Sequence, residues 1–274
     1  MASVNRKVLP GLTLSLGYTL FYLSLLVLVP IAACFLKASS LSFEEFWGAV
    51  WTDRARAAYL LTFGAAFVAA VANAVLGLLL AWVLVRYAFP GKRIVDSLID
   101  LPLALPTAVA GLVYSALYVK KGWLGQYLVP LGIQGAYSRL GIVLVLIFVG
   151  LPFVVRTVQP ILEDLDPESE EASASLGATR WQTFRSVILP TLRPALITGF
   201  ALAFARGVGE YGSVVFISGN MPYKTEIAPI LIVARLEEFA YGEATAIAVV
   251  LLIISFAMLI LINRLERWSL RHEQ

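Results

Sequence analysis

The chain has 274 residues, of which 59% are hydrophobic and only 14% are charged. Soluble domains average about 45–50% apolar and about 25% charged residues, so this composition excludes a soluble globular domain, a disordered chain and a nucleic-acid-binding module. The formal net charge of +3 is too small to imply a polyanionic partner, and one cysteine with one histidine leaves no ligand set for a transition metal. We therefore expect an integral membrane protein without a metal site.

Long uncharged intervals predict the membrane spans, because a membrane helix needs about 20 mostly apolar residues. Five intervals reach this length or nearly reach it, and a sixth apolar stretch is interrupted by two charged residues. The expected spans cover residues 14–36, 59–86, 98–118, 132–156, 192–218 and 243–263. They predict an all-α integral membrane fold of six transmembrane helices, with residues 1–274 forming a single transmembrane domain.

The basic residues predict the orientation. With the N-terminus inside, the inner segments hold twelve lysines and arginines and the outer segments eight, so the positive-inside rule favours an N-in/C-in topology. The first span allows an alternative, because Arg6 and Lys7 precede its apolar run and residues 31–34 resemble a lipoprotein cleavage box ending in Cys34. The run is longer than the apolar region of a signal peptide, about 7–15 residues, which favours an uncleaved first span.

The segment 160–190 between the fourth and fifth spans is rich in acidic residues. Asp166 followed by Pro167 predicts the start of a helix, because aspartate is a favoured N-cap and proline suits the first helical position. Gly177 is placed to end that helix in the left-handed conformation. From these residues alone, a solvated charged loop and a helix–glycine–helix element that another surface contacts remain equally open.

A second short helix is expected directly after Gly177. Thr179 and Gln182 have the spacing of a capping box, which marks a helix N-terminus. We expect this helix to run to Leu189 and to stop at Pro190, because proline lacks the N–H that would continue it.

This loop resembles the EAA motif of ABC importer permeases, in which EAA is followed by three variable residues, a glycine and, about a dozen residues later, a hydrophobic-Leu-Pro end. The matching positions are Glu171, Ala172, Ser173, Gly177, Ala178, Leu189 and Pro190. Ser173 is the visible departure, since alanine is usual there. The resemblance implies a type I (MetI-like) importer permease fold, and a loop that serves as the coupling helix docking on a separate ATPase.

The chain contains no G-x-x-x-x-G-K-[ST] loop for phosphates. ATP and Mg²⁺ would therefore be bound by the partner ATPase. We expect this chain to be a transporter subunit rather than an enzyme, with no catalytic residues and no cofactor of its own.

The fifth span carries a charged pair. Arg206 lies thirteen residues beyond Arg193, roughly 20 Å into a helix that rises about 1.5 Å per residue. A charge at this depth costs at least about 2.5–3.5 kcal/mol on insertion scales, so it normally faces a partner or a polar pathway. Glu210 lies one turn further along the same face. Two interpretations remain open: a structural ion pair, or a pathway in which Arg206 or free backbone N–H groups attract an anion.

The stretch from Arg206 to Ser213, followed by Gly219 and Asn220, resembles the fifth-span segment of the sulfate and molybdate branch of these permeases. It is closer to the T-type permease subunits of sulfate/thiosulfate importers than to molybdate members, and residues 101–111 are similar to the proline-containing third span of that branch. On this resemblance the translocation pathway is expected at Arg206, Gly209, Glu210, Tyr211, Gly212 and Ser213. Residues 225–241 are expected to form an outer interfacial helix, either near the gate or as a simple amphipathic cap.

The resemblance implies a membrane-spanning subunit of an ATP-driven importer of sulfate and thiosulfate in the bacterial cytoplasmic (inner) membrane. Its expected partners are a second permease subunit forming a heterodimer, two ATP-binding subunits, and a periplasmic or extracellular solute-binding protein. Molybdate or another solute is the alternative within the same class. A secondary transporter driven by an ion gradient is the alternative from a different class, and the lack of a detectable inverted repeat argues against it.

Overall fold

The computed structural model describes residues 12–271, and these residues form helices without a β-strand. The elements run in the order α1 (Leu12–Leu23), the π-helical η1 (Ser24–Leu28), α2 (Val29–Ala38), α3 (Phe43–Val50), α4 (Asp53–Arg86), α5 (Lys92–Ile99), α6 (Leu101–Ala104), α7 (Thr107–Tyr118), α8 (Gly125–Leu128), the 3₁₀ turn η2 (Val129–Leu131), α9 (Arg139–Glu163), α10 (Pro167–Ser175), α11 (Arg180–Thr183), the π-helical η3 (Phe184–Ile188), α12 (Leu189–Val208), α13 (Val214–Ile217), α14 (Ala228–Glu237) and α15 (Tyr241–Arg271). The all-α fold expected from the sequence is confirmed for this part of the chain.

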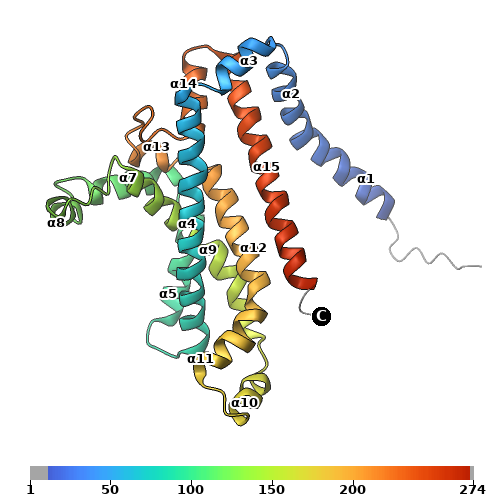
Figure 1. The fold of residues 1–274 in the computed structure, drawn as a ribbon, viewed down its shortest axis with the longest axis vertical. Coiled ribbons are helices and arrows are strands. Elements are labelled where there is room, and N and C mark those ends of the chain that lie inside the picture. Colours follow the sequence, from blue (N-terminus) through green and yellow to red (C-terminus); the bar gives the residue numbers. More distant parts are fainter. Residues whose placement is uncertain (1–11, 272–274) are drawn as a thin grey trace, which may run out of the picture.

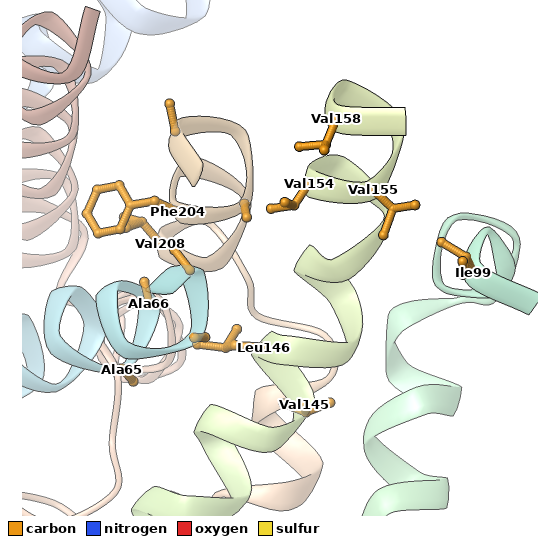
Figure 2. Close-up of a cluster of buried hydrophobic side chains, with 14 of the residues drawn as sticks. Ala65, Ala66, Ile99, Val145, Leu146, Val154, Val155, Val158, Phe204 and Val208 are labelled. Atoms are coloured by element: carbon orange, nitrogen blue, oxygen red, sulfur yellow. The ribbon is translucent and has the colours of Figure 1, made fainter. Parts of the chain in front are cut away.

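Three long helices, α4, α9 and α12, pack along one another and contain the core of the bundle (Figure 1). Small residues set their spacing: a Cβ added at Gly77 of α4 would lie 2.7 Å from Val154 of α9. Figure 2 shows part of this cluster, to which α4 contributes Ala66, α9 contributes Leu146 and α12 contributes Phe204 and Val208. Close backbone approach of this kind is how membrane helices gain packing energy without a hydrophobic driving force.

Five helical segments of residues 12–271 are long and apolar enough to cross a membrane. They are Leu14–Ala38, Asp53–Arg86, Arg139–Glu163, Arg180–Val208 and Tyr241–Ile262. They correspond to the first, second, fourth, fifth and sixth expected spans, with different ends. The helix of the fourth expected span, α9, begins at Arg139 rather than at residue 132. Gly132 and Tyr137 have positive φ angles of 78° and 55°, which a right-handed α-helix does not allow. Helix α9 then continues to Glu163.

The third expected span, residues 98–118, is not one helix but is divided among α5, α6 and α7. Pro106 explains the second break, because the residue before a proline is driven out of the helical region. Leu105 accordingly has an extended backbone, with φ −81° and ψ 138°. The remaining helix α7 has 12 residues, which is shorter than the roughly 20 needed to cross the hydrocarbon alone.

An arginine attaches the broken segment to the bundle. Arg156 of α9 donates to both carboxylate oxygens of Asp100, at 2.9 and 2.6 Å, and to Asp96 Oδ1 at 2.7 Å. Both aspartates lie on or directly after α5, so this ion-pair cluster holds α5 against α9.

The expected helix stop at Pro190 is wrong, because Arg180–Val208 forms one continuous helical segment. The π turn η3 ends at Ile188, two residues before the proline, and the Leu189 N–H donates to the Phe184 carbonyl five residues back. A π turn widens the helix locally, and this accommodates a residue whose ring would clash with the carbonyl of an ordinary α-turn. The chain leaves the helix only after Val208, so the expected span 192–218 is also interrupted.

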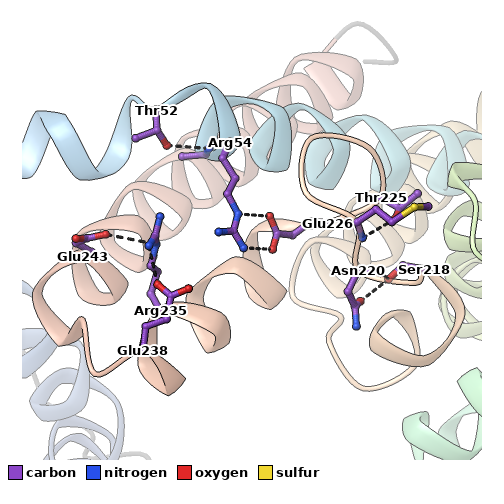
Figure 3. A network of polar contacts seen from close by, with 11 residues as sticks. Thr52, Arg54, Ser218, Asn220, Thr225, Glu226, Arg235, Glu238 and Glu243 are labelled. Atoms are coloured by element: carbon purple, nitrogen blue, oxygen red, sulfur yellow. Dashed lines mark hydrogen bonds and ion pairs between the residues drawn. The ribbon is translucent and has the colours of Figure 1, made fainter.

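The two ends of the bundle carry different elements. Helices α3 and α14 lie at one end, α10 and α11 lie at the other, and α7 and α8 project to one side (Figure 1). Figure 3 shows the polar network near α14, in which Arg54 of α4 donates to both oxygens of Glu226, at 2.8 and 2.7 Å. Arg235 contacts Glu238 and Glu243 at 2.7 and 3.3 Å. These ion pairs attach α14 to the ends of α4 and α15.

Candidate functional site

The EAA-like loop (residues 160–190) contains α10 and the start of the continuous helix at α11, and both helix N-termini and the turn at Gly177 match the sequence expectations. The Asp166 side chain accepts a hydrogen bond from the Glu168 N–H at 3.0 Å and so caps α10. Gly177 follows the helix with φ +82°, the left-handed conformation that glycine adopts without strain. Thr179 and Gln182 form the expected capping box at the start of α11, with the Thr179 N–H donating to Gln182 Oε1 at 2.7 Å.

The EAA-like residues differ in how far they are exposed to solvent. Glu171 and Ala172 are exposed on α10, where another protein could reach them. The Ser173 hydroxyl lies 3.0 Å from the Thr183 hydroxyl, so the departure from alanine supplies a hydrogen bond between α10 and α11. Among the remaining motif residues, Gly177 is exposed, and three are half-buried: Ala178, Leu189 and Pro190.

Two large apolar side chains of this loop are more than half exposed. Leu176 is 88% exposed and Trp181 is 67% exposed. Trp181 borders a groove of about 710 Å³, which is lined by Trp82, Glu170, Glu171, Ala174, Ala178, Arg180, Trp181, Thr183, Phe184 and Ile188. Exposed apolar side chains beside a groove are typical of a protein-binding surface.

Contacts between this loop and α4 were not expected from the sequence. Arg86, the last residue of α4, forms an ion pair with Glu170 of α10. Its guanidinium carbon lies 5.3 Å from the centre of the Trp82 ring, and that ring meets Phe184 edge-on at 5.7 Å. The loop contains many carboxylates, so no sequence signal selects Glu170 as the partner of Arg86.

The second candidate site is the α12–α13 turn (residues 209–213). The Glu210 side chain is buried, and its Oε2 lies 2.5 Å from Arg206 Nη1. Its Oε1 accepts hydrogen bonds from the N–H and the hydroxyl of Ser213, both at 2.9 Å. One carboxylate therefore neutralises the arginine and also closes the turn. The Arg206 side chain remains 34% exposed, so the ion pair does not bury its whole guanidinium.

The turn is packed directly against α7. A Cβ added at Gly111 would lie 2.2 Å from the Ser213 carbonyl oxygen, and one added at Gly212 would lie 2.2 Å from Thr107 Oγ1. The Ser115 hydroxyl donates to a carbonyl of α13 at 2.8 Å. Backbone therefore touches backbone here, and the broken third span and the broken fifth span support each other.

The six expected pathway residues do not share one environment. Arg206 and Gly212 are half-buried, Gly209 and Tyr211 are exposed, and Glu210 and Ser213 are buried. The last two form the hydrogen bonds that hold the turn, while Gly209 and Tyr211 remain accessible from outside the chain.

Comparison with known proteins agrees with this architecture. Residues 73–272 match the family described as "Binding-protein-dependent transport system inner membrane component". The chain is 50% identical over 266 residues to the sulfate transport system permease protein CysT of Salmonella typhimurium, covering 97% of this chain and 96% of the relative. It is 48% identical over 262 residues to CysT of Escherichia coli, covering 96% of this chain and 95% of the relative.

Solved structures show the same fold at low sequence identity. One chain of a bacterial ABC transporter that imports the acidic polysaccharide alginate has a TM-score of 0.76 and 16% identity, covering 93% of this chain and 94% of that one. A chain of the inward-facing MetNI methionine ABC transporter has a TM-score of 0.55 and 20% identity, covering 84% and 99%. The fold is therefore the MetI-like fold of ABC importer permeases. The matched family covers residues 73–272, and a relative with 50% sequence identity covers 97% of the chain. The chain therefore belongs to the inner-membrane components of binding-protein-dependent transport systems.

Proposed function

We propose that this chain is the membrane-spanning subunit of an ATP-driven importer that carries sulfate and thiosulfate across the bacterial cytoplasmic membrane. The observation that carries the proposal is 48–52% identity to four permeases named for sulfate transport, over 93% or more of this chain. Coverage this long takes in both the EAA-like loop and the α12–α13 turn. The likeness is therefore not confined to the general fold.

The proposed topology has six spans within one domain, residues 1–274, with both termini inside. The third span would be formed by α5, α6 and α7 together, and broken helices are tolerated in membranes where protein or a water-filled cavity covers the free backbone groups. The contacts between α7 and the α12–α13 turn support this arrangement. N-in/C-in places α10 and α11 in the cytoplasm and α14 on the outer face, in agreement with the excess of basic residues in the inner segments.

The EAA-like loop would dock on a partner ATPase, which binds ATP and Mg²⁺. Glu171, Ala172 and Gly177 would transmit the movement of that subunit, and exposed Leu176 and Trp181 would enter its surface. Their exposure supports this role. The complete complex would contain two ATPases, a second, different permease and a solute-binding protein outside. An alginate transporter of the same fold has been solved in complex with its periplasmic protein.

The α12–α13 turn would line the path of the anion. Arg206 would supply positive potential from its exposed part, beside accessible Gly209 and Tyr211. Buried Glu210 would hold the guanidinium in place and prevent it from binding the anion too tightly. Gly212 and Ser213 would keep the turn against α7. The support is the combination of an arginine that is paired and a turn that is partly open.

The test is uptake of radiolabelled anions into vesicles that contain the complete complex with its binding protein. We expect ATP-dependent uptake of sulfate, competed by unlabelled thiosulfate and not by molybdate. Equal uptake without the ATPase subunits would show a secondary transporter, and uptake of molybdate alone would show a different substrate. The control is the same complex with an ATPase that cannot hydrolyse ATP.

A further inference from the structure

We propose that Arg86 is a positioning residue that couples the EAA-like loop to α4, separately from the chain connections of the loop. The inference rests on the proposed function, because it assigns a role in transmitting the movement of the ATPase. The loop is joined covalently to α9 through residues 164–166 and to α12 through the continuous helix that begins at Arg180. The third core helix, α4, has no covalent connection to it.

Arg86 supplies that missing connection from the end of α4. It pairs with Glu170, and the two side chains are 28% and 27% exposed, so water only partly screens the pair. The guanidinium also lies over the Trp82 ring, 5.3 Å from its centre, in a cation–π contact. An arginine held on two sides has little freedom to reorient, and its carboxylate partner is therefore held at a defined place.

A second contact runs beside the ion pair. The Trp82 ring meets Phe184 edge-on at 5.7 Å, and Phe184 stacks on Trp181 at 5.5 Å. Phe184 is the first residue of the π turn η3. The chain of contacts from Glu170 through Arg86 and Trp82 to Phe184 therefore touches both halves of the loop.

This arrangement makes the loop a body fixed to all three core helices. The hydrogen bond between Ser173 and Thr183 already joins α10 to α11. A push on α10 from a docked ATPase would therefore displace the end of α4 together with α9 and α12. Without Arg86, α10 would reach α4 only indirectly, through the Ser173–Thr183 hydrogen bond and the Phe184–Trp82 contact, and part of the movement would be lost before it reached α4.

Transport per ATP is the first test, in the complete complex in vesicles. Arg86→Ala and Glu170→Gln should each lower the ratio of sulfate taken up to ATP hydrolysed by about threefold, the scale of a partly exposed ion pair. The double variant should fall no further than either single change, because both remove the same contact. Arg86→Lys should keep most of the ratio. The matched control is Arg93→Ala, which removes a nearby exposed charge that has no ion pair among the described residues.

A distance measurement tests the same inference without any transport. Spin labels at Tyr87→Cys and Ser175→Cys, in a Cys34→Ser background, report the separation of α4 and α10. With Arg86 present, we expect the distance to stay constant between the nucleotide-free and ATP-trapped complex. With Arg86→Ala, we expect it to change or broaden on ATP binding.

The outcomes separate the two proposals. An unchanged transport ratio in Arg86→Ala, or a label distance that moves as much with Arg86 as without it, would overturn the positioning role. Loss of the ATPase from purified Arg86→Lys and Glu170→Gln complexes would overturn it too, since Arg86 would then act in docking. A wild-type complex that takes up no sulfate would refute the proposed function, while the label distances would still decide the role of Arg86.

Discussion

Gly111→Ala is the change that most directly tests the contact between α7 and the α12–α13 turn. The new Cβ would lie 2.2 Å from the Ser213 carbonyl oxygen, whereas ordinary contacts are 3.4–4 Å, so α7 and the turn must separate by about 1 Å. Inserting a methyl group against backbone costs about 3 kcal/mol at the upper end of the overpacking range. Alanine returns up to about 1 kcal/mol through its better helix propensity. The expected net loss is about 2 kcal/mol, roughly a thirtyfold change in the folding equilibrium.

The assay is thermal unfolding of the purified chain in detergent, together with sulfate uptake by the complete complex. Gly64→Ala is the matched control, because Gly64 is also helical and a Cβ there would meet nothing within 4 Å. We expect Gly64→Ala to unfold at or above the wild-type temperature and Gly111→Ala well below it, with reduced uptake. The reasoning is refuted if the two variants unfold together and both transport normally, since α7 and the turn would then not be in contact.

Three further changes test the remaining sites. Gly177→Pro should permit membrane insertion yet abolish ATP-coupled uptake, because proline cannot adopt φ +82°; unchanged uptake would contradict the coupling role. Arg206→Gln should reduce sulfate uptake, because it removes the positive charge and leaves the buried Glu210 carboxylate without its ion-pair partner. Full uptake at normal expression would mean that Arg206 has a structural role only. Glu226→Gln should lower the unfolding free energy by about 1.5–3 kcal/mol, the range for hydrogen bonds to a charged group, because the partly exposed Arg54 loses its bidentate partner. An unchanged unfolding midpoint in SDS titration would refute this.

Local features of the chain were predicted well, for a physical reason. The N-cap at Asp166, the left-handed Gly177 and the capping box at Thr179 are all seen in the structure. Each depends on hydrogen bonds or backbone angles within about four residues, so the residues close in sequence are enough to predict it. The long apolar helices are equally local, because the bilayer penalises charge residue by residue.

Proline showed the limit of such local rules. Pro190 was expected to end a helix, but a π turn absorbs the clash and the helix continues. Pro106 does interrupt the third span, and there the chain is supported by α13 and α9 on either side. The same residue type therefore has opposite outcomes, which the proline alone does not predict.

The scarcity of charge, by itself, determined that this is an integral membrane protein, and the spacing of the few charges outlined most of its spans and a loop between two of them. Only the tertiary structure decided which charges meet. Arg86 and Glu170 are 84 positions apart, and Glu210 closes a turn against α7, on a different span. Burial and hydrogen bonding between distant segments exist only after the helices have packed, so the broken helices and the contact between loop and α4 could not be read from sequence periodicity.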